Sequence, residues 1–454
     1  MSSTAATPNI IFFLTDQQRW DTVGRYGNRM GITPNLDRMA DEGILFQSAF
    51  SCQPVCGPAR ACIQTGRYGA ETGCFRNQIA LPASERTIAH YLSEAGYEVG
   101  YIGKWHLAST MLVPGVENRD CITKPVPLEL RGGWKDYWLA SDTLEFTSHG
   151  YDGYLFDGDM KKVDFKGYRV DCLTDFALDY LRNRDKQRPF FLFLSYVEPH
   201  HQNDRNRYEG PTGSRDRFRD FEVPGDLQDT EGDWRESYPD YLGCCASLDR
   251  NLGRLRRELE ELGLSENTLV VYTSDHGCHF RTRNDEYKRS CHDASIRIPM
   301  IAKGPRFTGG KAITELVSLI DLPPTLLAAG GLGKPPAMRG RHLQELVSGT
   351  AVDWPEEVFI QISENHIGRA IRTKRWKYSI WAPDGNGMSQ PGSARYVEQC
   401  LYDLADDPHE KNNLVSDPAR AETRAGLAQV LKRRMAEAGE ATPEIRPAEP
   451  DCQV

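Results

Sequence analysis

Continuous apolar runs alternate with helical patterns over the first two thirds of the chain. Residues 9–15 (NIIFFLT) form one such run, which is typical of a strand buried on both faces of a parallel sheet. Residues 33–43 (TPNLDRMADEG) predict a helix with Thr33 as N-cap, Pro34 in its first turn and Gly43 at its end. The order of helix and then strand recurs in residues 87–104, 170–197 and 247–275.

This alternation predicts an α/β fold with a large, mostly parallel sheet sandwiched by helices. After about residue 350 the pattern changes, because residues 357–363 and 369–381 resemble antiparallel strands and a predicted helix follows near 420–438. We therefore expect a larger domain over residues 1–350 and a smaller C-terminal α+β subdomain with an antiparallel sheet over residues 351–454.

Polar residues follow four of the predicted strands. These residues are Asp16 and Gln17, Lys104 and His106, His200 and His201, and Asp275 and His276. In open α/β sheets, active sites lie beyond the carboxyl ends of the strands. The pattern thus predicts a site at this edge of the sheet.

Charge and composition narrow the classes of partner. The formal net charge is −9, which argues against nucleic acid or an anionic membrane as a partner, although an acidic protein can still hold a positive pocket for a small anion. No apolar run is long enough to span a bilayer, and the N-terminus lacks the basic region of a signal peptide. We expect a cytoplasmic protein, or a periplasmic or secreted one if a leader was removed.

The twelve cysteines are irregularly spaced, which favours buried thiols over a disulfide framework. Cys52 and Cys56 lie in the segment SCQPVCGPAR, and no second Cys/His pair at matching spacing accompanies them. A structural zinc site is therefore not predicted. For an arbitrary cysteine, a free structural thiol would be the default interpretation.

The residues around Cys56 resemble a known signature. Cys56-Gly57-Pro58-Ala59-Arg60, with QTGR at 64–67, is similar to the Cys-x-Pro-x-Arg signature of sulfatases. Four further segments resemble that family in order, namely NIIFFLTDQQ, GYIGKWHL, YVEPHH and VYTSDHG, and LYDLADDPHEKNNL (401–414) resembles its C-terminal part. The chain is identified as a member of the formylglycine-dependent sulfatases, within the alkaline-phosphatase-like superfamily.

Two pairs depart from the commonest family pattern. Many sulfatases carry Asp-Asp and Asp-Asn where this chain has Asp16-Gln17 and Asp275-His276. These variants are nearest to the branch of choline sulfatases and phosphonate monoester hydrolases. The departure leaves the identity of the metal and the substrate class open.

The resemblance implies that a maturation enzyme oxidises Cys56 to formylglycine and that one divalent cation lies beside it. The implied metal ligands are Asp16, Gln17, Asp275 and His276, together with residue 56. Calcium prefers oxygen ligands and a histidine ligand favours Mn²⁺, so Ca²⁺, Mn²⁺ and Mg²⁺ all remain open. The alternatives are helix N-caps for the two aspartates and a buried structural histidine for His276.

The family also implies a two-step reaction. One hydroxyl of the formylglycine hydrate attacks sulfur and releases the alcohol, and the second hydroxyl then loses its proton as sulfate leaves. Arg60 would hold the hydrate, although a surface salt bridge is the default role of an arginine. Lys104 would contact the sulfate, and His106 would act as the base.

Three more residues complete the predicted site. His200 would be the leaving-group acid and a sulfate ligand, and His201 is a further candidate to face substrate. Lys288 would be the second sulfate-contacting cation, with adjacent Arg289 as the alternative. His279 and His292 are interpreted as structural.

The predicted function is hydrolysis of a sulfate monoester, with a carbohydrate as the favoured substrate. The nearest alternative is a phosphonate monoester or phosphate diester hydrolase on the same site, and a different class is an unmodified, non-catalytic anion binder. The aromatic and acidic stretch 131–158 is a candidate sugar contact or a packed surface loop. His366, Arg369 and Arg372 are candidates for the border of the pocket, and nothing in the pattern indicates an oligomeric state.

Overall fold

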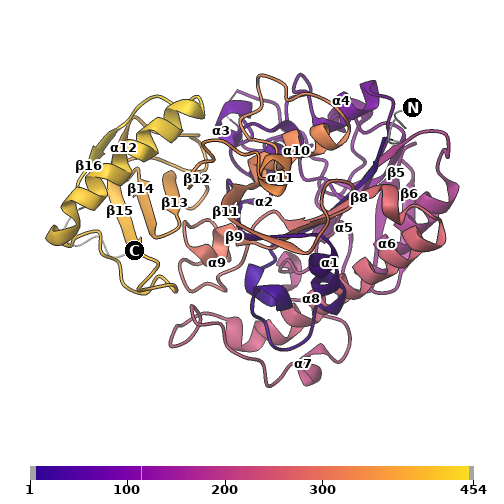
Figure 1. The fold of residues 1–454 in the computed structure, drawn as a ribbon, viewed down its shortest axis with the longest axis horizontal. Coiled ribbons are helices and arrows are strands. Elements are labelled where there is room, and N and C mark those ends of the chain that lie inside the picture. The colour runs from indigo at the N-terminus through magenta and orange to yellow at the C-terminus, as the bar shows by residue number, and fades with distance from the viewer. Residues whose placement is uncertain (1–6, 114, 449–454) are drawn as a thin grey trace.

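A large sheet runs through the bigger part of the molecule (Figure 1). The computed structural model describes residues 7–113 and 115–448, and within them this sheet has eleven strands. In spatial order they are β11 (Lys311–Ser318), β2 (Ile44–Phe50), β10 (Met300–Lys303), β8 (Thr268–Ser274), β1 (Asn9–Thr15), β7 (Phe190–Ser195), β3 (Glu98–Lys104), β4 (Tyr137–Ser141), β5 (Asp152–Asp157) and β6 (Lys162–Lys166), with β9 (Arg297–Ile298) beside β2.

The centre of this sheet is parallel and its flanks are mixed. Strands β8, β1, β7, β3 and β4 run in one direction, whereas β10, β5 and β6 are antiparallel to their neighbours. Every residue of β1, β3, β7 and β8 is buried, which explains their continuous apolar sequences. The predicted α/β class is confirmed.

Helices cover both faces of the sheet. Alternate residues of β1 enter different hydrophobic cores, because successive side chains of a strand point to opposite faces. One core contains side chains from α1 (Pro34–Glu42), α6 (Arg169–Asn183) and α8 (Trp234–Glu261). The other contains side chains from α2 (Cys56–Thr65), α4 (Ile88–Glu94), α10 (Leu322–Ala329) and α11 (Gln344–Ser348). Short helices α3 (Gly69–Thr72), α5 (Leu144–Thr147), α7 (Ser214–Arg217) and α9 (Asp293–Ile296) lie in the connections.

Helix α8 is longer than the leucine pattern indicates. It begins at Trp234 rather than at residue 247. Its first half buries Tyr238, Tyr241 and Leu242 in a separate aromatic cluster, which has no leucine periodicity. Tertiary packing therefore extends a helix that sequence periodicity marks only in its second half.

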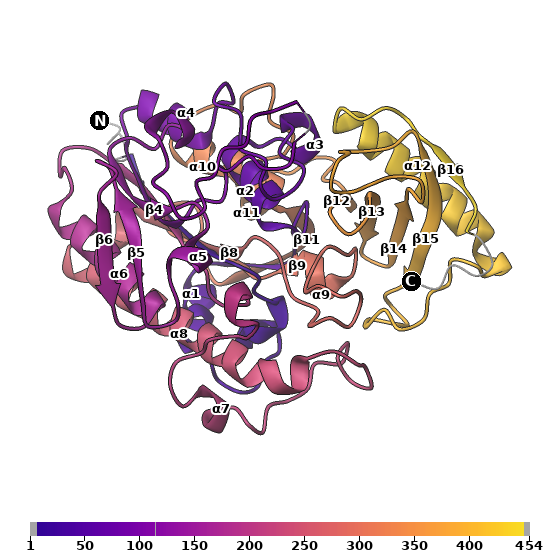
Figure 2. The ribbon, with the colours of Figure 1, turned by 180° about the vertical axis from the view of Figure 1, so that it is seen from behind.

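A second, smaller sheet forms the C-terminal part of the molecule (Figures 1 and 2). Its strands are β12 (Glu357–Ile362), β13 (Gly368–Thr373), β14 (Trp376–Trp381), β15 (Arg395–Asp403) and β16 (Glu444–Arg446). The first four pair antiparallel, as predicted, and β16 pairs parallel to β15. Helix α12 (Ala421–Glu437) packs against β12, β13 and β14. A further apolar cluster joins this sheet to Phe50, Cys291 and Ile296 of the larger part.

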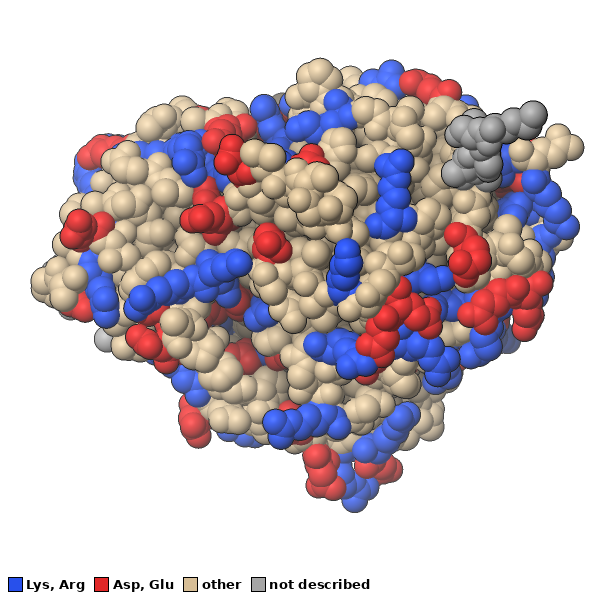
Figure 3. Space-filling view, in the orientation of Figure 1, with Lys and Arg blue, Asp and Glu red and all other residues tan. Residues whose placement is uncertain are grey.

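The surface carries charges of both signs. Basic and acidic side chains are interspersed on the face seen in Figure 3. Among the helices that the structure describes, none combines the length and apolar character needed to cross a bilayer.

Gly103 gives a test of how tightly β3 and β7 pack. Its φ is +108°, and a Cβ at this position would lie 2.0 Å from the Ser195 carbonyl oxygen. We expect Gly103→Ala to lower the free energy of unfolding by at least about 2 kcal/mol, measured by urea denaturation, because a Cβ would force the two strands apart. Gly158→Ala is the control, since a Cβ there meets nothing within 4 Å. Equal stability of the two variants would contradict the close approach.

Candidate active site

The carboxyl ends of four neighbouring strands converge on one point. Strands β8, β1, β7 and β3 are adjacent in the sheet. Asp275 follows β8, Asp16 follows β1, His200 lies in the loop after β7, and Lys104 is the last residue of β3. The structure therefore brings together the four polar strand ends that the sequence singles out.

Cys56 lies at the centre of this group, at the first residue of α2. Its Sγ is 2.8 Å from Lys288 Nζ, 3.2 Å from His276 Nε2 and 3.4 Å from Asp16 Oδ1. The residue is 1% exposed. At the start of this helix, the sulfur lies among both positive and negative groups.

The surrounding cations change the chemistry of this thiol. Burial alone would raise the pKa of Cys56, but the charges of Lys104, Lys288 and His276 lower the pKa well below its ordinary value. A hydrogen bond with His106 acts in the same direction. The environment at position 56 thus stabilises negative charge.

Asp16 connects the cations on the other side of Cys56. Its Oδ2 accepts hydrogen bonds from Lys104 Nζ at 2.8 Å and from Arg60 at 3.0 Å. Arg60 Nε also lies 3.3 Å from Asp275 Oδ2. Burial and the Cys56 charge would raise the pKa of Asp16, but Lys104, His200 and Arg60 together lower it. Asp275 differs, because burial and the nearby Asp16 charge raise its pKa.

Lys288 and two histidines face the same space. Lys288 Nζ lies 3.1 Å from His200 Nε2, so the loop after β7 and the segment after β8 meet at this lysine. His106 lines the pocket above Cys56 and has a φ of +58°. Its Nδ1 is buried without a hydrogen-bond partner among the described residues. A strained backbone that holds an unpaired ring nitrogen at a pocket is typical of a functional position.

The donor set at the strand ends fits a divalent cation. One donor atom from each of Asp16, Cys56, Asp275 and His276 lies within 4.8 Å of the others, and all four residues are buried. Gln17 Oε1 and Asp275 Oδ2 are buried and have no hydrogen-bond partner in the described part of the chain. Gln17 also has a φ of +70°. Within the described residues Gln17 Oε1 has no partner and Asp275 Oδ2 has only the Arg60 ion pair, so these oxygens, with the Asp16 carboxylate and the His276 imidazole, fit the ligand shell of a divalent cation.

Glu145 belongs to the site, although the sequence indicates only the stretch 131–158 around it as a candidate sugar contact and not this residue. Its Oε1 accepts a hydrogen bond of 2.8 Å from Lys104 Nζ, and its Oε2 is buried without a partner among the described residues. Burial would raise the pKa of Glu145, but Lys104, His200 and His106 lower it to about 2. Glu145 lies in α5, outside the family motifs, so only the folded chain places it beside Lys104.

One predicted substrate contact, His201, lies outside the pocket, and the two adjacent cations Lys288 and Arg289 have different partners. The His201 ring stacks on Tyr287 at 4.5 Å between ring centroids, and His201 is not among the described residues that line the pocket above Cys56. Of the two adjacent cations, Lys288 points to Cys56, whereas Arg289 pairs with Glu364. The structure thus separates the roles of these two neighbours.

The three candidates from the second sheet do not line the pocket either. Arg369 forms an ion pair with Glu440, and Arg372 pairs with Asp293. His366 is half-buried beside Trp381. Among the described residues, the second sheet reaches the pocket instead through Glu364 and Met388.

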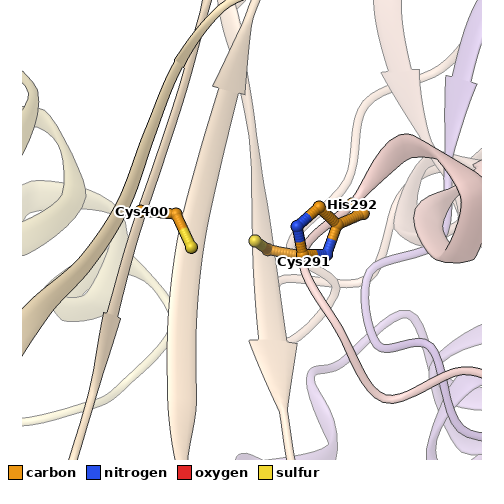
Figure 4. A group of neighbouring side chains, drawn as sticks. All are labelled: Cys291, His292 and Cys400. Carbon is orange, nitrogen blue, oxygen red and sulfur yellow. The ribbon is translucent and has the colours of Figure 1, made fainter. Parts of the chain in front are cut away.

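A second cluster of donor side chains lies where the two sheets meet. Cys291, His292 and Cys400 are buried, with their donor atoms within 4.8 Å of one another. The sulfur atoms of Cys291 and Cys400 face each other across the gap between the 277–292 segment and β15 (Figure 4). A hydrogen bond with Cys400 lowers the pKa of the Cys291 thiol, and His292 Nε2 lies 3.1 Å from the Tyr402 hydroxyl. The eleven cysteines of the described residues are all unpaired, as expected.

Comparison with known families gives two matches. The family model described as Sulfatase matches residues 8–332. The model described as N-sulphoglucosamine sulphohydrolase, C-terminal, matches residues 285–437.

Individual proteins agree with the family models. The chain is 31% identical to an ulvan-active sulfatase of Formosa agariphila, over 95% of this chain and 82% of the relative. It is 26% identical to an N-acetylglucosamine-6-O-sulfatase of Bacteroides thetaiotaomicron, over 94% and 86% of the two chains. The crystal structure of the sulfatase yidJ from Bacteroides fragilis superposes with a TM-score of 0.82 at 26% identity, and covers 96% of this chain and 97% of its own.

The cation site can be tested by thermal unfolding. We expect Mn²⁺ or Ca²⁺ to raise the Tm of the wild-type protein, and a chelator to reverse the shift, because a dication relieves the repulsion between the buried Asp16 and Asp275. Asp275→Asn should abolish most of this cation-dependent shift. The control is Asp249→Asn, a buried aspartate that accepts hydrogen bonds from the start of α1 and lies outside the donor cluster. An undiminished shift in Asp275→Asn would contradict the assignment.

Proposed function

The chain belongs to the sulfatase family and is a sulfuric ester hydrolase, and on that premise we propose that it hydrolyses a sulfate monoester of a saccharide through a formylglycine formed from Cys56. One observation carries the proposal. Cys56 opens α2 with its sulfur in contact with Lys288, His276 and Asp16. In this geometry, the sulfur stands in for an oxygen of the formylglycine hydrate. A nucleophile at this point would face the donor cluster on one side and the pocket on the other.

The residues around position 56 divide into those that hold a cation and those that hold the ester. Asp16, Asp275 and His276 would hold a divalent cation, since one donor atom of each lies within 4.8 Å of the others. Gln17 would add its Oε1, which is buried without a hydrogen-bond partner among the described residues. When bound, the cation would act as a Lewis acid and lower the pKa of a bound hydroxyl. The formylglycine would supply that hydroxyl and a second one, through which sulfate is released. Mn²⁺ and Ca²⁺ both suit this donor set, and the imidazole favours Mn²⁺.

The cationic side chains would position the sulfate group. Lys288 Nζ contacts Cys56 Sγ directly, and Lys104 Nζ is held between Asp16 and Glu145. Both ammonium groups are buried, so each would interact strongly with an equatorial sulfate oxygen that gains charge during the reaction. Arg60, fixed by Asp16 and by the Ser195 hydroxyl, would orient position 56.

Two histidines are placed for proton transfer. His200 lines the pocket, and its Nε2 lies 3.1 Å from Lys288 Nζ. From this position it could protonate the oxygen of the departing alcohol. His106 lines the pocket beside Cys56 and lowers the pKa of the Cys56 side chain, so it could take the proton of the remaining hydroxyl when sulfate leaves. Each histidine thus serves one half of the reaction.

The relatives support a saccharide as the substrate class. One is described as acting on ulvan and another on N-acetylglucosamine 6-O-sulfate. The pocket above Cys56 is open to molecules of this kind, because polar side chains such as Asn77, Gln78 and Asn203 line it.

Burial of Cys56 constrains its maturation. The residue is 1% exposed, and its sulfur is surrounded by groups from β1, β8 and the segment that carries Lys288. A separate enzyme that oxidises the thiol therefore needs to reach it before α2 packs onto the sheet.

Turnover and mass spectrometry together test the proposed function. We expect the matured protein to hydrolyse p-nitrophenyl sulfate and Cys56→Ala to lose at least about 1,000-fold in kcat/KM, because the covalent nucleophile is removed. Peptide mass spectrometry of active protein should find an aldehyde at position 56. Cys62→Ala is the control, because Cys62 is buried in the same helix away from the donor cluster.

A comparison of sulfate and phosphonate esters that share an aryl leaving group tests the chemistry. Rates on p-nitrophenyl sulfate and on an aryl phosphonate monoester should favour the sulfate. Faster turnover of the phosphonate, or full activity with an unmodified thiol at position 56, would contradict the proposal.

A further inference from the structure

The mouth of the pocket above Cys56 is built from both sheets. Glu364 lies in the connection between β12 and β13, and Met388 lies in the connection between β14 and β15. The larger part of the molecule contributes Phe146, Glu286 and Arg289. Any group attached to the reacting sulfate must pass between these side chains.

Arg289 and Glu364 form a fixed pair at this mouth. An Arg289 terminal nitrogen lies 2.5 Å from Glu364 Oε2, and Glu364 Oε1 accepts a hydrogen bond of 2.6 Å from the Asn77 backbone N–H. The φ angles are +67° at Glu364 and +68° at Arg289. Left-handed backbone at two residues other than glycine is costly, and it persists where the surroundings require one geometry. The Arg289–Glu364 ion pair therefore forms a rigid part of the pocket wall.

The same mouth offers two exposed apolar side chains. Phe146 is 43% exposed and Met388 is 45% exposed. A sugar ring presents hydroxyls around its edge and apolar C–H groups on its faces. A polar pair beside two apolar side chains matches both kinds of surface.

The charge of the mouth is negative. Among the described residues that line the pocket, Lys288 and Arg289 carry permanent positive charges, while His106 and His200 are the lining histidines. Lys288 points inward to Cys56. Arg289 is bound by two carboxylates, because it also lies 3.2 Å from Glu286 Oε1. One guanidinium thus faces two carboxylates, and among the described lining residues no further lysine or arginine is left to balance a second anionic group on the substrate.

We propose that the mouth formed by Glu286, Arg289 and Glu364 selects saccharides whose only negative charge is the reacting sulfate. Arg289 donates to ring hydroxyls and the carboxylates accept from them, while Phe146 and Met388 contact the ring faces. A second sulfate or a carboxylate on the same sugar meets uncompensated negative charge. This inference rests on the proposed function and names its substrate class.

Matched mono- and disulfated monosaccharides test the selection. With matured enzyme, we expect kcat/KM on N-acetylglucosamine 6-sulfate to exceed that on glucosamine 2-N,6-O-disulfate by at least about tenfold. Glu286→Gln and Glu364→Gln should each narrow this ratio by about fivefold, because each removes one negative charge near the second sulfate. Glu286 is 49% exposed, so its variant tests the charge without a risk to folding.

Controls separate this inference from the proposed function. Glu71→Gln removes a buried carboxylate that also pairs with an arginine and a backbone N–H, but outside the pocket, and should leave the ratio unchanged. Turnover of p-nitrophenyl sulfate should change less than about twofold in Glu71→Gln, because Glu71 lies outside the pocket. Equal wild-type rates on the two sugars, turnover of the aryl ester alone, or an unchanged ratio in both variants would overturn the selection but leave the sulfatase activity standing. Loss of all turnover in matured wild-type protein would overturn the proposed function and this inference together.

Discussion

The balance of buried charge beneath α2 is the constraint on which the site depends. Asp16, Asp275 and Glu145 are countered by Arg60, Lys104 and Lys288, and all six side chains are almost completely excluded from water. A buried ion is tolerated only when partners of opposite charge and hydrogen bonds surround it. Each group therefore needs the others, and the removal of one partner leaves an uncompensated charge in a medium of low dielectric.

This balance gives the two forms of residue 56 different electrostatic surroundings. In the thiol form, Lys288 is drawn to the Cys56 sulfur, whose pKa the cations lower. An aldehyde carries no charge, so its formation would leave Lys104 and Lys288 available to an incoming anion. A divalent cation held by Asp16 and Asp275 would add to the attraction. In the thiol form the lysine charges are balanced by the Cys56 sulfur, and after the proposed modification they are free to bind sulfate.

The sheet makes such a cluster possible because it delivers one functional residue at the end of each of several adjacent strands. The strands themselves are buried on both faces, so their side chains pack into two cores and do not move. Asp16 and Asp275 follow β1 and β8, which pair in register along seven residues. The distance between the two carboxylates is consequently fixed by backbone hydrogen bonds rather than by flexible loops.

Much of this arrangement is predictable from the sequence, for reasons that are local. Apolar runs that end in Asp16, Lys104 or Asp275 identify buried strands and their polar ends, and the rule of parallel sheets then places those ends together. Glu145 could not be predicted, because it pairs with Lys104 only through contacts that are distant in the sequence. The pairing of Arg289 with Glu364, and the position of His201 behind Tyr287, depend in the same way on how two loops meet.

The contact between Cys291 and Cys400 has a mechanical consequence for the molecule. Cys291 lies three residues after Lys288, and Cys400 belongs to β15 of the smaller sheet. Asp293, two residues after Cys291, forms ion pairs with Lys377 and Arg372 of the smaller sheet. The smaller sheet therefore packs against the segment that carries Lys288 and holds it in place. A chain that ended before β12 would keep Asp16, Cys56, Asp275 and His276. It would still lose the contacts that hold the Lys288 ammonium group in position.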